Sequence, residues 1–274
     1  MDKPGNLCYY YRERLCGKPG EEVPVLPGKV CVTLRIDVMG VGFDNLTKSE
    51  FTAKAEDMLQ NRERGYVVTP NAEIVYESIH DDGFRQLLND ASLVLPDGAG
   101  VVLGAKILKT PLKQKVAGIE FAQNLLPILA ETGAKLYLLG SKPGVAELAA
   151  EKMLQKHPTL QICGMQDGYF QDEDAVIAKI NEAEADVLYV CLGAPKQEKF
   201  MQRHQADLKV KLMIGLGGTL DGIAGTVKRA PQIFIRLGLE WFYRLLKEPR
   251  RIGRMMRLPK FYFGTWIFKL KTKK

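Results

Sequence analysis

Short apolar runs recur along most of this chain and alternate with longer stretches that mix apolar and polar residues. Several of the short runs end in glycine, and continuous apolar runs of this kind are typical of strands buried in a parallel sheet. The longer stretches place apolar residues at helical spacing. Because strands and helices alternate, we predict an α/β fold with a doubly wound, mostly parallel, Rossmann-like sheet. The predicted strands are residues 30–38, 65–71, 93–95, 135–140, 160–164, 186–193 and 211–215, and the predicted helices are residues 47–60, 72–79, 99–108, 116–132, 145–155 and 172–183, with another that opens at 194–198.

The two ends of the chain depart from this alternation. Residues 1–28 are rich in Gly and Pro and have no clear period, so we expect a poorly ordered N-terminal extension. Residues 29–226 form the predicted α/β body, in which residues 40–45 indicate a turn and Thr47 with Glu50 predicts a helix-opening capping box. Residues 227–274 form a predicted basic, amphipathic, helical appendage that interleaves arginines with aromatic residues.

The positive charge of the chain is concentrated in this appendage. The 274 residues carry a net charge of +7, yet residues 227–274 hold 14 of the 39 Lys and Arg and two of the 32 Asp and Glu. The appendage is therefore near +12 and the rest near −5. Such a helix suits an anionic membrane surface or a lipid-linked phosphate. Two alternatives stay open: it packs on the body through its aromatic residues, or it binds nucleic acid, which the acidic body disfavours.

Other features of the chain exclude several classes of protein. Residues 1–6 lead into no long apolar stretch, so no signal peptide is predicted, and no apolar run approaches the roughly 18 residues of a spanning helix. Five scattered cysteines favour reduced thiols in a cytoplasmic protein. A G-x-G-x-x-G pattern starts at Gly215 and Gly217 but has Leu220 as its last residue, and no Walker A motif is present. A nicotinamide-dependent enzyme and an ATPase are therefore disfavoured, whereas a nucleotide-sugar enzyme is not.

The first candidate for chemistry is Asp97, which follows the apolar run 93–95 in the sequence Pro96-Asp97-Gly98. In a doubly wound sheet the ligand crevice lies at the carboxyl ends of the strands, and the turn could direct Asp97 into it. The alternative is that Asp97 is only a helix N-cap. Thr69 and Asn71 end a strand that we expect to lie beside this one. They either cap the next helix or hydrogen-bond a sugar.

Several other strands end in glycine and pass directly into a helix, which predicts a row of helix N-termini along one edge of the sheet. Such an edge suits a nucleotide phosphate, although each glycine alone could be an ordinary turn residue. Lys115 precedes another helix, where it is either a surface residue or a partner for an anion at the helix N-terminus. Gln197 and Glu198 are either ligand-binding residues or first-turn residues of an exposed helix. The remaining candidates at this edge are Gly140, Ser141, Gly193, Gly217 and Gly218.

The run Asp172-Glu173-Asp174 matches the D-x-D pattern by which many sugar transferases bind a divalent metal ion. It also opens a predicted helix, where acidic residues are favoured by capping and by the helix dipole. We expect the second role, and we predict neither a metal site nor a cofactor.

Taken together, these pieces resemble the WecB/TagA/CpsF family of bacterial glycosyltransferases, from about residue 31 to about residue 257. The matching pieces are Thr69-Pro70-Asn71, Pro96-Asp97-Gly98, residues 192–198, Gly217-Gly218, Ala224-Gly225, Arg229-Ala230-Pro231, Leu239-Glu240-Trp241, Arg244, Glu248-Pro249, Arg251 and Arg254.

The resemblance implies a metal-independent, inverting transfer of N-acetylmannosamine from a UDP-sugar to undecaprenyl-diphosphate-linked N-acetylglucosamine, by a protein peripheral on the inner face of the cell membrane. The product would be the linkage unit of wall teichoic acid or another surface polysaccharide, the latter with a different UDP-sugar donor as one alternative. Homo-oligomers are compatible with the sequence.

The resemblance also implies roles for single residues. Asp97 would be the general base, Thr69 and Asn71 would lie at the sugar site, and Gln197 would lie in the substrate pocket. Lys115 departs from the family, which often has arginine at this position, so a point charge replaces bidentate phosphate contact. The residues implied to hold the lipid diphosphate are Arg244, Arg250, Arg251 and Arg254.

Overall fold

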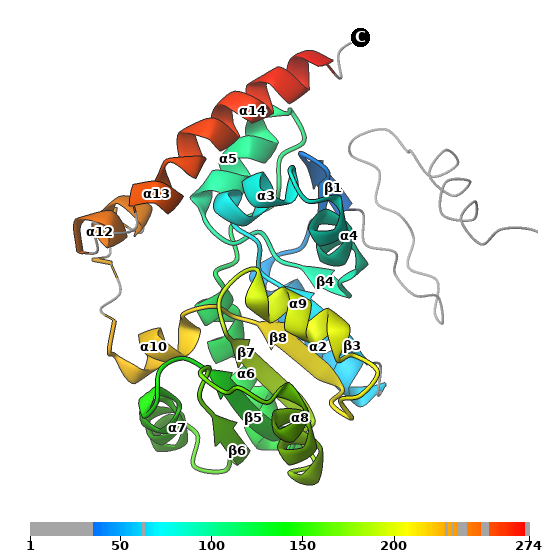
Figure 1. Ribbon diagram of the computed structural model, residues 1–274, viewed down its shortest axis with the longest axis vertical. Coiled ribbons are helices and arrows are strands. Elements are labelled where there is room, and N and C mark those ends of the chain that lie inside the picture. The colour runs from blue at the N-terminus through cyan, green and yellow to red at the C-terminus, as the bar shows by residue number, and fades with distance from the viewer. Residues whose placement is uncertain are drawn as a thin grey trace, which may run out of the picture. The chain divides into compact units, whose positions relative to one another are not determined.

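Among the described residues, six strands form a central sheet in which every neighbouring pair is parallel (Figure 1). The computed structural model describes residues 35–61, 64–227, 230–231, 233–234, 240–247 and 252–271, so the predicted extension over residues 1–28 lies outside them. The strand order is β4-β3-β8-β7-β5-β6, which confirms the predicted α/β class. The strands are β3 (Gly65–Val68), β4 (Leu93–Val94), β5 (Lys135–Gly140), β6 (Gln161–Gln166), β7 (Val187–Cys191) and β8 (Leu212–Gly215).

The sheet is covered on both faces, and strand β7 shows why its residues are almost all apolar. Val187, Tyr189 and Cys191 belong to the core on one face, whereas Leu188 and Val190 belong to the core on the other. Successive strand residues point to opposite faces, so a strand buried on both sides needs an unbroken apolar run. This is the pattern from which the doubly wound sheet was predicted.

Different helices supply the two cores. Helices α2, α6, α7 and α10 pack on one face, and α3, α4, α5, α8 and α9 pack on the other. The predicted capping box is confirmed: Glu50 N donates to Thr47 Oγ1 at 3.2 Å, and Thr47 N donates to Glu50 Oε2 at 2.6 Å. The helices are α2 (Lys48–Gln60), α3 (Ala72–Ser78), α4 (Asp82–Asp90), α5 (Ala99–Ile107), α6 (Gly118–Thr132), α7 (Val145–Lys156), α8 (Glu173–Glu182), α9 (Lys196–Arg203), α10 (Thr219–Ala224), α12 (Glu240–Lys247), α13 (Ile252–Met255) and α14 (Arg257–Lys271).

The sequence prediction is wrong for residues 40–45, which do not form only a turn. They contain a strand, β2 (Val41–Asp44), that pairs antiparallel with β1 (Arg35–Val38) outside the main sheet. A two-residue loop with positive φ at Met39 (57°) and Gly40 (92°) closes this hairpin. Loops of this kind match the twist of paired strands, so the hairpin forms although a non-glycine residue occupies one of its two positions.

The C-terminal helix α14 packs on the body against α3 and α5 (Figure 1). Phe261 is fully buried in the core that lies on that face of the sheet. The appendage therefore packs on the body through an aromatic residue, which is one of the two alternatives given in the sequence analysis. The opposite side of α14 exposes Phe263, Trp266 and Leu270. No helix among the described residues has both the length and the apolar character needed to cross a membrane.

Candidate active site

The carboxyl ends of the strands bring the predicted site residues to one edge of the sheet. Asp97 follows β4, Thr69 and Asn71 follow β3, and Gly217 follows β8, so these residues occur at the ends of three neighbouring strands. Farther along the same edge are the ends of β7 and β5, with their own predicted residues. We call this edge the rim. The remaining predicted residues at the rim are Gly218 after β8, Gly193, Gln197 and Glu198 after β7, and Gly140 and Ser141 at the end of β5.

Asp97 is not the N-cap of the helix that follows it. Gly98 holds that position, with φ of 83°, and α5 begins without any side-chain cap. The backbone N–H of Asp97 donates to Pro70 O at 3.3 Å, which ties the Asp97 turn to the end of β3. A Cβ built on Gly98 would lie 3.8 Å from Asn71 Cβ. The half-buried Asp97 therefore lies in the same corner as Asn71.

Thr69 and Asn71 both have structural partners. Thr69 Oγ1 is buried and donates to Gly215 O at 2.8 Å, so this hydroxyl links β3 to β8 and does not cap α3. Asn71 Oδ1 does cap α3, because it accepts from Glu73 N and Ile74 N at 3.0 Å each. A contact between either residue and a sugar stays a prediction.

Lys115 lies next to the Asp97 turn through its neighbour in the chain. Val116 N donates to Pro96 O at 3.0 Å, and Lys115 is half-buried. Helix α6 begins three residues later at Gly118, where a Cβ would lie 3.4 Å from Thr69 Oγ1. The start of α6, Lys115 and Asp97 thus converge at the β3–β4 end of the rim, which is the arrangement needed to bind an anion at a helix N-terminus.

Most helices that begin at the rim lack a side-chain cap. Helices α5, α6, α7, α9 and α10 have no side-chain hydrogen bond at the N-cap, whereas α3 and α8 do. The first N–H groups of a helix have no partner within it, so uncapped helix starts can donate to a phosphate. In the sequence these N-cap positions hold glycine, alanine or proline in place of the usual Ser, Thr, Asp or Asn, so the lack of side-chain caps could have been predicted.

Gln197 and Glu198 are buried, so the exposed-helix alternative is wrong. Gln197 Oε1 accepts from Gly217 N at 2.8 Å, and Gln197 Nε2 donates to Glu198 Oε1 at 2.8 Å. The two side chains are 2% and 0% exposed. Burial raises the pKa of Glu198 to about 7, and the nearby charge of Glu77 adds to the effect.

The β5 end of the rim has an unusual backbone. Gly140 has φ of 122°, and a Cβ there would overlap the backbone of Cys191, so only glycine fits. Ser141 also has positive φ (61°), and its Oγ donates to Asp221 Oδ2 at 2.9 Å. Asp221, in the first turn of α10, is a rim residue that the sequence analysis did not include. The one feature of the sequence that could have identified it is its position just after the Gly217-Gly218 pair.

The acidic run 172–174 serves the fold, as expected. Asp172 caps α8 by accepting from Ala175 N at 3.0 Å. Glu173 Oε2 lies 2.8 Å from His204 Nε2 and accepts from Arg203 Nη1 at 2.7 Å, and these two partners lower its pKa. Among the described residues, no group of three or more His, Cys, Asp or Glu side chains is arranged to hold a metal ion.

The predicted lipid-diphosphate arginines are only partly within the description. Arg250 and Arg251 lie outside the described residues, and for Arg244 on α12 and Arg254 on α13 only the helical backbone is described. Their role stays a prediction. Arg257 at the start of α14 has a different partner, since its Nη1 donates to Glu77 Oε2 on α3 at 2.7 Å.

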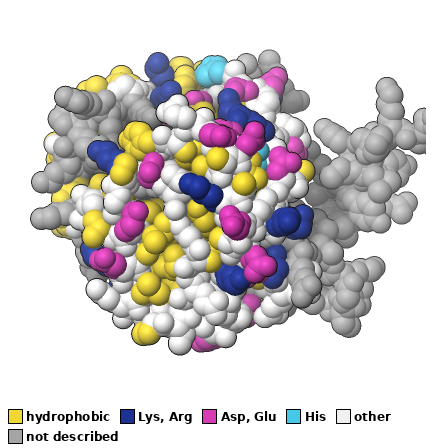
Figure 2. Space-filling model, turned by 60° about the horizontal axis from the view of Figure 1, so that its bottom comes forward, with side chains coloured by type: hydrophobic (Ala, Val, Ile, Leu, Met, Phe, Trp, Pro, Cys, Tyr) yellow, Lys and Arg dark blue, Asp and Glu magenta, His cyan; other side chains and the backbone are white. Residues whose placement is uncertain are grey.

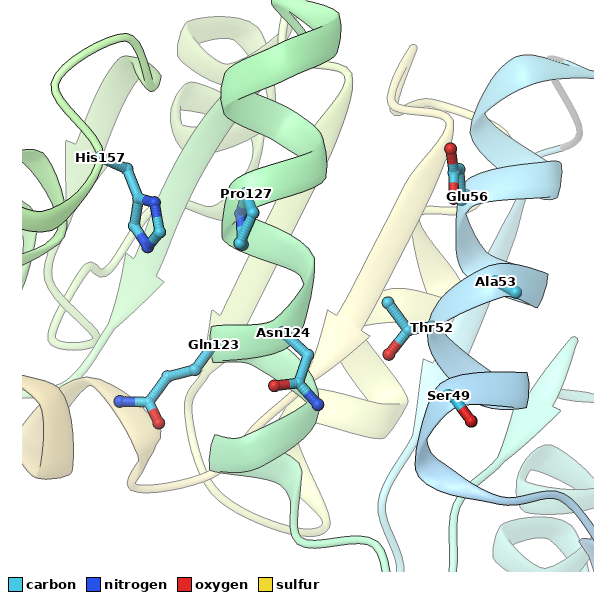
Figure 3. Close-up of a pocket in the computed structure, with 8 residues that line it drawn as sticks. All are labelled: Ser49, Thr52, Ala53, Glu56, Gln123, Asn124, Pro127 and His157. Atoms are coloured by element: carbon cyan, nitrogen blue, oxygen red, sulfur yellow. The ribbon is translucent and has the colours of Figure 1, made fainter.

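One surface groove lies apart from the predicted site residues. A groove of about 450 Å³ between α2 and α6 is lined by residues such as Thr52, Asn124 and His157, and by none of the predicted site residues (Figure 3). On the face shown in Figure 2, Lys and Arg are interspersed with Asp and Glu. That face has no broad basic surface of the kind that binds nucleic acid.

The fold and the rim define a doubly wound α/β protein with a carboxylate and uncapped helix N-termini at its strand ends. A family model described as "Glycosyl transferase WecG/TagA/CpsF family" matches residues 36–274. The chain is also similar to a protein of Staphylococcus aureus (strain MRSA252) named N-acetylglucosaminyldiphosphoundecaprenol N-acetyl-beta-D-mannosaminyltransferase, with 35% identity over 245 residues, 88% of this chain and 96% of the relative. A protein of the same name from strain MW2 matches to the same extent. The chain belongs to the WecG/TagA/CpsF glycosyltransferase family, which confirms the resemblance noted from the sequence.

Proposed function

We propose that this chain transfers N-acetylmannosamine from UDP-N-acetylmannosamine to undecaprenyl-diphosphate-linked N-acetylglucosamine, in the synthesis of wall teichoic acid or a related surface polysaccharide. One observation carries this proposal: a half-buried carboxylate, Asp97, shares the rim with five uncapped helix starts. The family supports a glycosyl transfer, and the names of the relatives support the same transferred sugar and the same acceptor.

In this mechanism Asp97 is the general base. The acceptor hydroxyl is a weak nucleophile, so Asp97 takes its proton as the oxygen attacks the anomeric carbon of the donor sugar. The bond from that carbon to UDP breaks on the opposite face, which inverts the configuration. Negative charge then develops on the UDP phosphate, and helix N-termini and Lys115 stabilise it without a metal ion or cofactor.

The proposed acceptor is a lipid, and the C-terminal helices offer groups that suit it. Trp241, Phe242 and Leu246 of α12 and Phe263 and Trp266 of α14 are exposed. Apolar and aromatic side chains next to many Lys and Arg suit the surface of an anionic membrane. We place the protein peripherally on the inner face of the cell membrane, with Arg244, Arg250, Arg251 and Arg254 at the lipid diphosphate.

The test is a transfer assay with purified protein, UDP-N-acetylmannosamine and a short-chain polyprenyl-diphosphate-N-acetylglucosamine, in the presence of EDTA. We expect UDP release above a control without acceptor. If UDP is released only when divalent metal is present, the metal-independent mechanism is wrong. If no UDP is released, the donor is wrong, and a panel of other UDP-sugars identifies the alternative polysaccharide function.

A further inference from the structure

The starting observation is a pair of buried polar side chains that are adjacent in sequence and bonded to each other. Gln197 and Glu198 lie in the first turn of α9, a helix that packs against α4 and against the strands β3, β7 and β8. Glu198 is completely buried, and its Oε2 has no hydrogen-bond partner. Burying an amide and a carboxyl group is costly compared with apolar residues of the same size. Packing alone therefore does not account for Glu198.

The second observation is what the pair does to the neighbouring strand. The side-chain amide of Gln197 has one acceptor atom, Oε1, and one donor atom, Nε2, and both are used. Oε1 accepts from Gly217 N, and Nε2 donates to Glu198 Oε1. If this amide turned by 180°, its NH₂ group would face the Gly217 N–H, donor against donor. Because Glu198 Oε1 accepts from Gln197 Nε2, the amide is favoured in the observed orientation, in which its Oε1 faces Gly217 N.

We propose that Glu198 is a positioning residue that orients the Gln197 amide and thereby holds the turn between β8 and α10. It acts through Gln197 and contacts no substrate itself. The turn is held from its other side by Thr69, whose Oγ1 donates to Gly215 O at 2.8 Å. Gly217 has a positive φ of 55°, and at both Gly217 and Gly218 no neighbouring atom lies within 4 Å of the position that a Cβ would take.

This inference rests on the proposed function, because it assigns the β8–α10 turn to the donor diphosphate. The turn has open space at Gly217 and Gly218, where the absence of side chains lets the backbone approach a diphosphate closely. Releasing the Gly217 N–H from Gln197 would let the turn move. UDP affinity should then fall, while the affinity for the lipid acceptor should not.

The experiment measures UDP binding by calorimetry in the full chain and in Glu198→Leu and Glu198→Gln. Leucine cannot accept the Gln197 hydrogen bond, so we expect UDP binding about tenfold weaker. The glutamine oxygen can accept it, so Glu198→Gln should bind UDP within twofold of the original chain. If Glu198→Leu binds UDP normally, or if Glu198→Gln loses tenfold, the positioning role is wrong. Failure of the original chain to bind UDP would contradict the proposed function instead.

A double-mutant cycle separates positioning from general damage to the fold. In a Gln197→Leu chain the Gly217 N–H has already lost its partner, so adding Glu198→Leu should weaken UDP binding no further. Additive losses would overturn the proposal. If the leucine variants do not fold, hydrogen exchange at the Gly217 amide gives the answer in Glu198→Gln alone. Protection equal to that of the original chain supports the acceptor role, and loss of protection contradicts it.

Discussion

The two halves of the rim are held in place in different ways. At the β7–β8 half, Gln197 and Thr69 fix the β8 turn through hydrogen bonds within the body. At the β3–β4 half, the helices that start beside Asn71 and Asp97 are covered by α14, which comes from the end of the chain. The β7–β8 half of the rim is thus held by contacts within the body, whereas the half with the proposed base is also covered by the appendage.

The contacts of α14 connect it to the two helices that begin beside Asn71 and Asp97. Gly100, in the first turn of α5, marks the point where three helices meet: a Cβ there would lie 2.8 Å from Ala72 Cβ on α3 and 3.2 Å from Leu258 Cδ1 on α14. The Arg257–Glu77 ion pair ties α14 to α3 as well. Since α3 starts at Asn71 and α5 starts just after Asp97, α14 fixes the two helix starts relative to each other.

The largest effect should come from Asp97 itself. Asp97→Asn keeps the size of the side chain but removes the proton acceptor, so we expect turnover to fall roughly a hundredfold to ten-thousandfold. UDP binding should be unchanged, because the substitution leaves Lys115 and the helix N-termini proposed to bind the phosphate in place. UDP release and calorimetry on the same sample measure the two quantities. Turnover close to that of the original chain would sink the general-base role.

Deletion of residues from 245 onward should come next. We expect transfer and binding to anionic vesicles to be lost and UDP binding to be retained. The α/β body should still fold, at a lower melting temperature, because removal of Phe261 exposes core residues of α5 and the hairpin. Circular dichroism, vesicle sedimentation and calorimetry test these points. A folded truncation that no longer binds UDP would show that both halves of the rim depend on α14.

A smaller effect is expected where α14 contacts α5. A methyl group added by Gly104→Ala would lie 2.8 Å from Phe261 Cζ, so α14 must shift, at a cost of about 1–3 kcal/mol less a helix-propensity gain of about 0.5–1 kcal/mol. Turnover should fall severalfold, with UDP affinity unchanged. The matched control is Gly253→Ala on α13, where a Cβ meets nothing within 4 Å. Equal turnover in the two variants would disprove the coupling.

The smallest effect concerns how the free energy of unfolding depends on pH through Glu198. Glu198 has a folded-state pKa of about 7, above its ordinary value of 4.5. The folded protein therefore holds this proton more tightly than the unfolded chain. Its stabilising contribution is complete below about pH 4.5 and is lost as the pH rises through about 7, at up to about 1.4 kcal/mol per pH unit. Urea unfolding from pH 5 to 8 should show a steeper decline for the original chain than for Glu198→Gln. Parallel curves would contradict this.

The sequence predicted the placement of the rim residues well, because the carboxyl ends of parallel strands share one edge whatever the strand order. Asp97, Asn71 and Gly217 are together for that reason. The bond from Gln197 to Gly217 could not be predicted in the same way, since it requires β7 to lie beside β8. Strand order depends on long-range packing that local periodicity does not contain.

Two further differences have local causes. The β1–β2 hairpin was missed because its loop, Met39-Gly40, has methionine where a positive φ usually selects Asn, Asp or Gly. Glu198 was expected to be either exposed or in contact with ligand, because acidic residues favour the first turn of a helix. Its burial depends on α9 packing under neighbouring helices, which a single-sequence pattern does not report.

The contacts of α14 also set an order of events during synthesis of the protein. Arg257 and Glu77 are 180 residues apart in sequence, and Thr265 Oγ1 donates to Met39 Sδ across 226 residues. Among the described residues, the hydrogen bonds that hold the β7–β8 half of the rim all lie before the end of α10 at Ala224, so this half can assemble while the chain is still being translated. The half with Asp97 is completed only after the last helix has left the ribosome. On the proposed function, a nascent chain therefore binds UDP before it is able to catalyse transfer.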